Sequence, residues 1–120
     1  MKKLVFITAM LLLGFGFCNA QISDAQSKGN YIVVYNSEGK VISSMFKKNN
    51  EELVGVTSSF FVVSNGSYIV TFNENCKVIA SMFSKGAEVR GAAGKTFTID
   101  DGNWITTYDA YCKVVRSRQK

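Results

Sequence analysis

The sequence predicts an all-β protein of eight to nine antiparallel strands in three hairpin-based repeats of about 36 residues, arranged as a barrel or a pseudo-threefold prism. A segment of aromatic and aliphatic residues occurs three times, at 31–36, 68–73 and 104–109. Each copy leads through a turn to a Lys-Val pair, and successive copies are 37 and 36 residues apart. Repeats of this length indicate one supersecondary unit used several times, each copy burying its apolar face on its neighbours.

Three segments of each unit show the period-two alternation that is typical of a half-buried strand. The segments between units, 47–56 and 84–94, could each hold a short fourth strand, and Gly55 in one matches Gly91 in the other. The predicted strands are 22–26, 31–35 and 41–46 in the first unit, 60–63, 68–72 and 78–83 in the second, and 96–99, 104–108 and 114–118 in the third.

Residues 21–120 are expected to form a single domain, because a chain of about 100 residues suits one modest core. The repeat units within it are about 22–46, 57–83 and 95–118. The alternative to a closed barrel or prism is an open array completed by a homo-oligomer, since the first and last units would otherwise leave sheet edges exposed.

Two kinds of turn separate the predicted strands. The dipeptides Asn65-Gly66 and Asp101-Gly102 join the first and second strands of their units, and both favour a type I′ hairpin turn. The turns between second and third strands are expected to be held by the side chain of their first residue, which is Asn36, Asn73 or Asp109.

Two cysteines, Cys76 and Cys112, occupy the turn position at which the first repeat has Gly39. That position suits a left-handed bulge, so both cysteines are expected to carry some strain. In an exported protein an even pair invites a disulfide, and the alternative is two unbonded residues in equivalent turns. A bridge requires Cα atoms roughly 4.4–6.8 Å apart, so a bonded pair would make the repeats converge around an axis.

Residues 1–20 have the pattern of a cleavable signal peptide, with Lys2-Lys3, an apolar run over 4–17 and then Cys18-Asn19-Ala20. The run is too short for a transmembrane helix. Acylation of Cys18 is the alternative, although Phe17 stands where lipoprotein signals carry a small residue. We therefore expect an exported bacterial protein, periplasmic or secreted. Removal of Lys2 and Lys3 would lower the formal net charge from +5 to +3.

Aromatic residues recur on one face of the middle strand of every unit, while the opposite face is aliphatic or Thr. With both faces largely apolar, this strand is expected to be central, one face lining the core and the other packing elsewhere. The predicted core residues are Ile69, Ile79, Phe83, Phe97, Ile99 and Ile105.

The repeated aromatics also predict a ligand site. Carbohydrate-binding proteins stack sugar rings on exposed aromatic side chains, and neighbouring Asn, Asp and Lys residues supply hydrogen bonds. The alternative is that the aromatics only pack one repeat against the next. The sugar model requires Trp104 or Tyr68 to be exposed beside polar groups. The candidate residues are Tyr31, Tyr35, Tyr68, Phe72, Trp104, Tyr108, Asn103, Asp109 and Lys113.

The period and strand count are similar, in a general way, to those of β-prism and β-trefoil lectins. The Gln-Asp-Asn-Val-Tyr type of sugar motif that marks the β-prism lectins does not occur in this sequence. The resemblance therefore implies an architecture and no particular binding residue.

Catalysis is not expected, because the sequence has no His and so lacks the usual general base and the usual partner of a nucleophilic Ser or Cys. Asp100 and Asp101 are adjacent in a hairpin turn, where acidic residues are favoured for backbone reasons. The sequence also lacks a loop with regularly spaced acidic residues of the kind that binds calcium. We expect no cofactor and no metal site.

The expected function is that of an exported, non-enzymatic binding module for carbohydrate. The basic C-terminus could meet an anionic surface or polysaccharide, whereas nucleic acid is not expected for an exported chain without a recognised module. The alternative is a protein-binding domain, such as a secreted protease inhibitor or a subunit of a surface assembly. An inhibitor needs a protruding loop, for which 87–95 is the best candidate.

Overall fold

The computed structural model describes residues 21–84 and 86–120, which form eleven antiparallel strands. The all-β prediction is confirmed. The strands are β1 (Asp24–Lys28), β2 (Tyr31–Tyr35), β3 (Val41–Phe46), β4 (Glu52–Val56), β5 (Phe61–Ser64), β6 (Tyr68–Phe72), β7 (Val78–Phe83), β8 (Glu88–Ala93), β9 (Thr96–Asp100), β10 (Trp104–Asp109) and β11 (Val114–Gln119).

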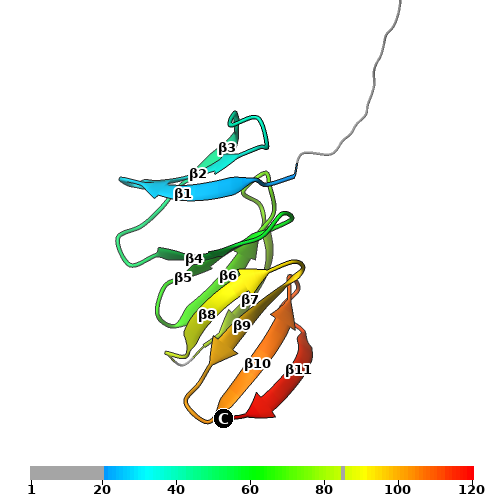
Figure 1. Ribbon diagram of the computed structural model, residues 1–120. Coiled ribbons are helices and arrows are strands. Elements are labelled where there is room, and N and C mark those ends of the chain that lie inside the picture. The colour runs from blue at the N-terminus through cyan, green and yellow to red at the C-terminus, as the bar shows by residue number, and fades with distance from the viewer. Residues whose placement is uncertain (1–20, 85) are drawn as a thin grey trace, which may run out of the picture.

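Three separate sheets divide the strands in chain order. The first sheet is β1-β2-β3, the second is β4-β5-β6-β7 and the third is β8-β9-β10-β11. Each is a simple up-and-down meander, as the hairpin turns predict. The sheets follow one another as layers from the first, in blue and cyan, to the third, in yellow to red (Figure 1).

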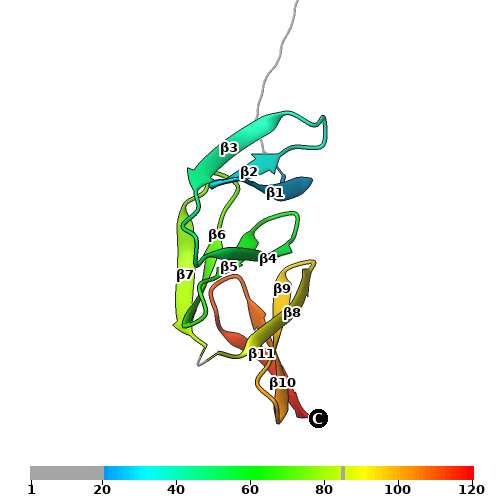
Figure 2. The same cartoon turned by 90° about the vertical axis from the view of Figure 1, so that its left-hand side faces the viewer.

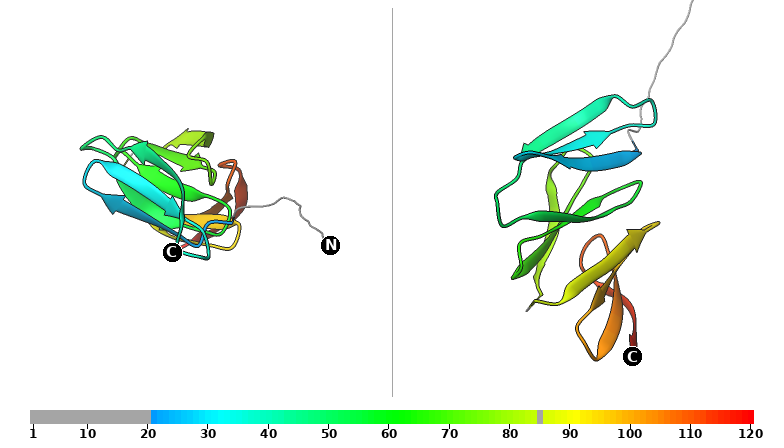
Figure 3. Two further views of the ribbon diagram at one scale, coloured as in Figure 1. Left: turned by 90° about the horizontal axis from the view of Figure 1, so that it is seen from above. Right: turned by 60° about the vertical axis from the view of Figure 1, so that its left-hand side comes forward.

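The sheets are stacked as an open array rather than closed on themselves. Turned by 90°, the molecule shows each sheet rotated relative to the one before it, with the third sheet far from the first (Figure 2). Seen from above, the sheets overlie one another (Figure 3). The closed barrel or prism was therefore the wrong arrangement, because each sheet packs on its neighbour in the stack and, among residues 21–84 and 86–120, no strand joins the third sheet to the first.

Two strands more than the predicted maximum are present, because both inter-unit segments contain a full strand. These strands, β4 and β8, form the first edge of the second and third sheets. Each pairs with its neighbour through a register shift, just before Gly55 in β4 and just before Gly91 in β8. A Cβ on Gly55 would lie 2.9 Å from the Cβ of Ala92, so β4 and β8 approach closely at this glycine.

The turns between the second and third strands are alike in all three sheets. The Asn36 side-chain oxygen accepts the N–H groups of Glu38 and Lys40 at 2.9 and 3.0 Å, and Asn73 and Asp109 do the same in their turns. These bonds confirm the predicted role of the first turn residue. Cys76 and Cys112 have φ angles of 61° and 62°, as the left-handed bulge requires.

The hairpins at Asn65-Gly66 and Asp101-Gly102 are not type I′, which would need positive φ at both residues. Only the glycines have positive φ, at 95° and 102°. Asn65 instead accepts the N–H groups of Ser67 and Tyr68 with its side-chain oxygen, at 3.1 and 2.7 Å. The side chain therefore holds the turn without a left-handed conformation at Asn65.

Two hydrophobic cores lie between the sheets. The first joins the first and second sheets around Ile32, Val34 and Phe61, and the second joins the second and third sheets around Phe60 and Phe97. Adjacent residues of the second sheet thus point into different cores. This arrangement explains why β5 and β6 are apolar on both faces, since the second sheet is covered on both.

Buried hydroxyl groups repeat one contact across both cores. Ser43 donates to the carbonyl of Glu74 at 2.6 Å, and Thr71 donates to the carbonyl of Ala110 at 2.6 Å. The two carbonyls occupy equivalent turn positions in the second and third sheets. Each sheet therefore binds the turn of the next sheet through one hydroxyl.

Cys76 and Cys112 are not bonded to each other. The Cys76 thiol lies 3.2 Å from the Ser43 hydroxyl and packs on the first core, whereas Cys112 packs on the second core. The disulfide prediction is not supported, because the equivalent turns of successive sheets lie in different interfaces.

Four of the predicted core residues pack in the second core, namely Ile69, Ile79, Phe97 and Ile99. Phe83 is 55% exposed, so its assignment to the core was wrong. Ile105 is half-buried on the outer face of the third sheet. The signal peptide and the alternative acylation of Cys18 lie outside the described residues. Within the described ranges the chain has no helix that could cross a membrane.

Candidate functional site

Three exposed aromatic side chains stand at equivalent positions of the sheets. Tyr31, Tyr68 and Trp104 begin β2, β6 and β10, and they are 52%, 48% and 45% exposed. Single exposed aromatics are common on protein surfaces, but these three recur at the same position of every sheet. Exposure of Trp104 or Tyr68 is one of the two conditions set for the sugar model, and it is met.

A second aromatic accompanies the exposed residue in two of the three sheets. Phe46 contacts Tyr31 with ring centroids 6.0 Å apart, and Phe83 contacts Tyr68 with centroids 5.5 Å apart, both edge-to-face. The sequence analysis did not include Phe46 or Phe83 in the site. The hairpin register would have identified them, since the last residue of β3 or β7 lies opposite the first residue of β2 or β6.

The other aromatic of each predicted pair lies inside the stack. Phe72 is buried and stacks on Phe61 at 5.2 Å, and Tyr108 stacks on Phe97 at 5.5 Å. Burial raises the pKa of the Tyr108 hydroxyl, with smaller contributions from the negative charges of Asp101 and Cys112. These two residues belong to the packing alternative, so the predicted pairs separate into one surface residue and one core residue.

Tyr35 is the exception among the inner aromatics. Its cross-strand partner is Asp24, whereas Phe72 and Tyr108 each face a Phe. The half-buried ring of Tyr35 carries the Lys28 ammonium group 5.3 Å from its centroid. It borders a shallow hollow of about 420 Å³ on the outer side of the first sheet.

A small groove lies between the second and third sheets beside the exposed Phe83, the ring partner of Tyr68. It has a volume of about 230 Å³, and its lining includes Phe83, Asp101, Thr106 and Tyr108. The Asp101 carboxylate accepts the Trp104 backbone N–H at 2.8 Å, which fixes the backbone at the start of β10. The groove therefore combines aromatic surface with a carboxylate and a hydroxyl group.

The polar residues predicted to assist Trp104 are not gathered around it. Asn103 precedes Trp104, and its carbonyl accepts the Lys120 backbone N–H at 2.9 Å. Asp109 and Lys113 lie at the opposite end of the β10–β11 hairpin, about 16 Å from Trp104 along the strand. The Asp109 carboxylate instead accepts two N–H groups of its own turn. The carboxylate that lies near the Trp104 backbone is therefore that of Asp101 and not that of Asp109, which was predicted.

A larger hollow of about 470 Å³ lies at the Asp109 end, between the β6–β7 and β10–β11 turns. Lys95, Asp109 and the exposed Tyr111 line it. Nearby, burial raises the pKa of the Cys112 thiol, and the Asp109 carboxylate raises it further. The thiol is therefore less ionised than an ordinary cysteine at any pH.

The predicted inhibitor loop is not a loop. Residues 88–93 form β8, which pairs with β9 and packs against β4. Gly91 and Gly94 therefore serve a bulge and a turn rather than a protruding segment. Among the described residues, no group of three or more His, Cys, Asp and Glu side chains is arranged to hold a metal ion.

Solved structures resemble this fold, although no family model and no curated sequence matches the chain. BamB from Moraxella catarrhalis has a TM-score of 0.55 at 13% identity, over 84% of this chain and 34% of that one. A Bacteroides caccae protein of unknown function has a TM-score of 0.55 at 10% identity, over 84% and 41%. KlHsv2 with loop 6CD replaced by a Gly-Ser linker has a TM-score of 0.53 at 14% identity, over 72% and 30%.

BamB and Hsv2 are β-propeller-like proteins, so the three stacked meanders of this chain correspond to successive propeller blades. The chain spans roughly two-fifths or less of the length of these structures. Complete propellers typically have four to eight blades of four strands around a central channel. The fold class is therefore an open, propeller-like array of three sheets.

Proposed function

We propose that this protein is an exported, non-enzymatic module that binds carbohydrate through the exposed aromatics Tyr31, Tyr68 and Trp104. One observation carries the proposal. A half-exposed aromatic recurs at the first residue of the equivalent strand in every sheet, which is β2, β6 or β10. Packing between sheets does not require these three rings, because the inner aromatics already fill the cores.

The chemistry around Tyr68, Phe83 and Trp104 suits a sugar. An aromatic ring offers a flat apolar surface for the C–H face of a pyranose, and nearby polar groups can hydrogen-bond its hydroxyls. The groove between the second and third sheets supplies the Asp101 carboxylate and the Thr106 hydroxyl near Phe83, which contacts Tyr68. Three such positions along one array would let a glycan chain bind at several points, which raises its overall affinity.

The test is binding of residues 21–120 to a broad glycan panel, followed by titration with Trp104 fluorescence as the signal. We expect a hit that changes the fluorescence, and Tyr68→Ala should weaken it roughly tenfold, about 1.4 kcal/mol. Trp104→Ala, measured by calorimetry, should weaken binding similarly. Tyr111→Ala is the matched control, because Tyr111 is exposed but lies outside the repeated set. A blank panel with correctly folded protein would refute the proposal.

Binding of an exported protein is the second candidate, and the outermost strands favour it. In the described chain β3 and β7 each pair with one strand only, and their sequences, Val-Ile-Ser-Ser-Met-Phe and Val-Ile-Ala-Ser-Met-Phe, differ at one position. Both expose their first Val and last Phe. An unpaired edge can accept a strand from a partner, with the exposed side chains adding specificity.

A proline scan separates the second candidate from the first. Ser44→Pro in β3 and Ser81→Pro in β7 change the outermost strands and leave Tyr68 and Trp104 unchanged. If a strand from a partner adds to these edges, capture of that partner from the exported proteome should be lost in both variants. Retention of the same partner by both folded variants would exclude strand addition.

A further inference from the structure

The outer face of the third sheet differs in chemistry from every other sheet face in the array. We call seven residues of this face the arginine face: Arg90, Thr96, Thr98, Ile105, Thr107, Arg116 and Arg118. Asp100, opposite Ile105, and Glu88, opposite Asp100, share the same face. Five of the seven line one shallow hollow of about 450 Å³. Thr107 lies opposite Thr98 on the neighbouring strand, and Arg116 lies opposite Thr107.

The second sheet shows what these positions do when another sheet covers them. The register of the two sheets is the same, so Arg118 corresponds to Met82, Arg116 to Ala80 and Thr98 to Val62. In the second sheet Met82 and Val62 pack in the second core. Arg90 and Thr96 likewise stand where Val54 and Phe60 face the third sheet. Apolar residues at five equivalent positions are thus replaced by Arg or Thr.

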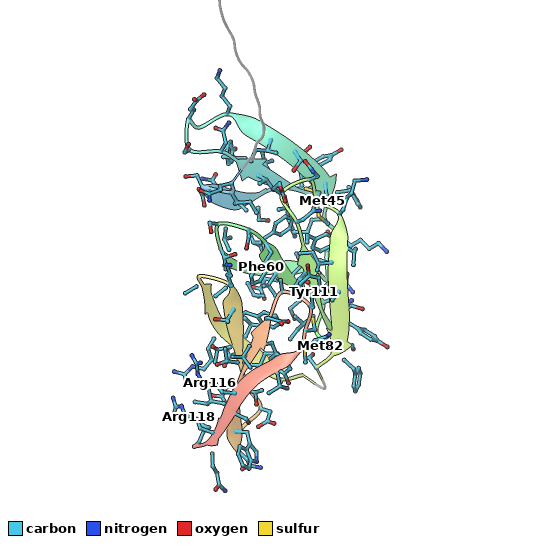
Figure 4. All side chains as sticks on the ribbon, turned by 90° about the vertical axis from the view of Figure 1, so that its right-hand side faces the viewer. Met45, Phe60, Met82, Tyr111, Arg116 and Arg118 are labelled. Atoms are coloured by element: carbon cyan, nitrogen blue, oxygen red, sulfur yellow. The ribbon has the colours of Figure 1, made fainter. Side chains whose placement is uncertain are left out.

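Terminal repeats of stacked arrays do carry polar outer faces for solubility, and that need alone would accept charges of either sign. Here each charged replacement is Arg. Figure 4 shows Arg116 and Arg118 pointing outward from the third sheet in the same direction, while Met82, the equivalent of Arg118, lies at the second sheet. Three Arg residues and Lys120 outnumber Asp100 and Glu88 on this face, so its net charge is positive.

Carboxylates of the described chain neutralise Arg90, at the β8 side of the face, but not Arg116 and Arg118, at the β11 side. Asp100 forms ion pairs with Arg90 at 3.6 Å and with Lys120 at 3.1 Å, and Glu88 stands opposite Asp100 at the β8 edge. Within the described residues, Arg116 and Arg118 have no carboxylate within 4.0 Å. Their guanidinium groups are therefore free to bind an external anion in bidentate fashion.

We propose that the arginine face binds an acidic polysaccharide, with Arg116 and Arg118 holding its carboxylate or sulfate groups. Arg116 and Arg118 are about 7 Å apart along β11, and Arg90 is three strands away, roughly 14 Å. A single small anion cannot reach both sides, whereas a chain of charged sugars lying across the sheet can. Thr96 and Thr98 face the sugar hydroxyls in the middle of the hollow, and Ile105 supplies an apolar floor.

This site is independent of the exposed aromatics. Trp104 and Ile105 are successive residues of β10, so their side chains point to opposite faces of the third sheet. Loss of one site should therefore leave the other intact. The two sites can be tested on the same protein.

The probes are dextran sulfate and polygalacturonate, with neutral dextran as the matched uncharged ligand. Wild-type protein should bind both polyanions at about 0.15 M salt, more weakly as salt rises, and should not bind dextran. Arg116→Ala combined with Arg118→Met installs the residues of the second sheet and should weaken binding about tenfold or more. Tyr111→Ala, which changes an exposed residue outside both proposed sites, should leave it unchanged.

The matched control is Lys40→Ala with Lys77→Ala, which removes two positive charges from the turns of the first and second sheets. This variant should lose less than about threefold. If the arginine and lysine double variants lost equal affinity, net charge alone would explain the effect and the proposal would be overturned. Failure of the wild-type protein to bind either polyanion would also overturn it. Duplex DNA bound as tightly as the polysaccharides, with the same dependence on Arg116 and Arg118, would overturn the polysaccharide as the ligand.

Folding of each variant is checked by circular dichroism and by Trp104 fluorescence. If the Met variant is unstable, Arg116→Gln with Arg118→Gln keeps a polar face, and the same loss is expected of it. Arg116→Lys with Arg118→Lys retains the charge but not the bidentate geometry, so it should restore part of the affinity. Full affinity in the Gln variant would overturn the proposal.

Discussion

The first residue of each β2–β3-type turn makes the same two hydrogen bonds in all three sheets, whether it is Asn36, Asn73 or Asp109. Such bonds depend on residues two and four positions later in the chain, so they form wherever the local sequence permits. Asp100 uses its side chain in the same way with Gly102 and adds two charged partners, Lys120 and Arg90. These turn hydrogen bonds can therefore be predicted from the local sequence.

Replacement of Asp100 by Asn should reveal its charge through pH. The Gly102 N–H and the Lys120 ammonium group lower the pKa of the Asp100 carboxyl. A lowered folded-state pKa stabilises the fold above the unfolded-state pKa, and the stabilisation is lost as pH falls through the folded-state value. Urea midpoints should be lower for Asp100→Asn than for wild type at about pH 7 and should converge at about pH 2. A difference that persists in acid would show a structural rather than an ionic cause.

The two free thiols give a second prediction at this scale. Non-reducing peptide mapping after alkylation in urea should find Cys76 and Cys112 both modified and not joined. In the folded protein Cys112 should react with iodoacetamide more slowly than it does in urea, because burial raises its pKa and the thiolate is the nucleophile. A peptide pair linked through Cys76 and Cys112 would contradict the structure.

At the scale of elements, β4 and β8 are equivalent strands whose packing differs, because only β4 has another sheet against its glycine. Both contain a glycine at the register shift, Gly55 in β4 and Gly91 in β8. Gly55 lies against Ala92 of the next sheet, whereas an added Cβ on Gly91 would meet nothing within 4 Å. The same sequence feature is a close-packing position in one sheet and an exposed one in the last.

We therefore expect Gly55→Ala to destabilise the protein by about 1–3 kcal/mol, because its Cβ would overlap that of Ala92. Gly91→Ala is the matched control and should change stability by less than about 0.5 kcal/mol. Chemical denaturation of both variants provides the measurement. Adding Ala92→Gly to Gly55→Ala should recover part of the loss, and equal effects of the two single variants would argue against the contact between β4 and β8.

The whole molecule is a linear stack, so each sheet depends only on the sheets next to it. The second sheet is covered on both faces, with Phe61 in the first core and Phe60 in the second. The first sheet has three strands and the third has four, and each has one outer face without a covering sheet in the described chain. Stacks of this kind have stabilities that approximate the sum of their repeats and interfaces.

Phe61→Ala and Phe60→Ala should separate the two interfaces. Either truncation of a buried Phe should cost about 3–5 kcal/mol, a large part of the stability expected of a domain this size. Amide hydrogen exchange should rise mainly in β1–β3 for Phe61→Ala and mainly in β8–β11 for Phe60→Ala. A uniform rise over all three sheets in both variants would indicate a single cooperative core instead.

The sequence by itself determined the repeats, the ranges of nine strands to within about two residues, the turn side chains and the left-handed positions of Cys76 and Cys112. These features depend on period-two alternation and on bonds between residues a few positions apart. It also indicated the exposed Tyr68 and Trp104 as candidates, but together with the buried Phe72 and the half-buried Tyr108, because all four share one face pattern.

Only the tertiary structure decided which of those aromatics faces water, that the stack stays open, and that Arg116 and Arg118 lie on an uncovered face. Burial of a strand face depends on whether another sheet lies over it, and that neighbour comes from residues about 36 positions away. The same register that buries Met82 in the second sheet exposes Arg118 in the third, because no further sheet of the described chain follows. Whether a strand face is buried therefore depends on the position of its sheet in the stack and not on the sequence of the strand alone.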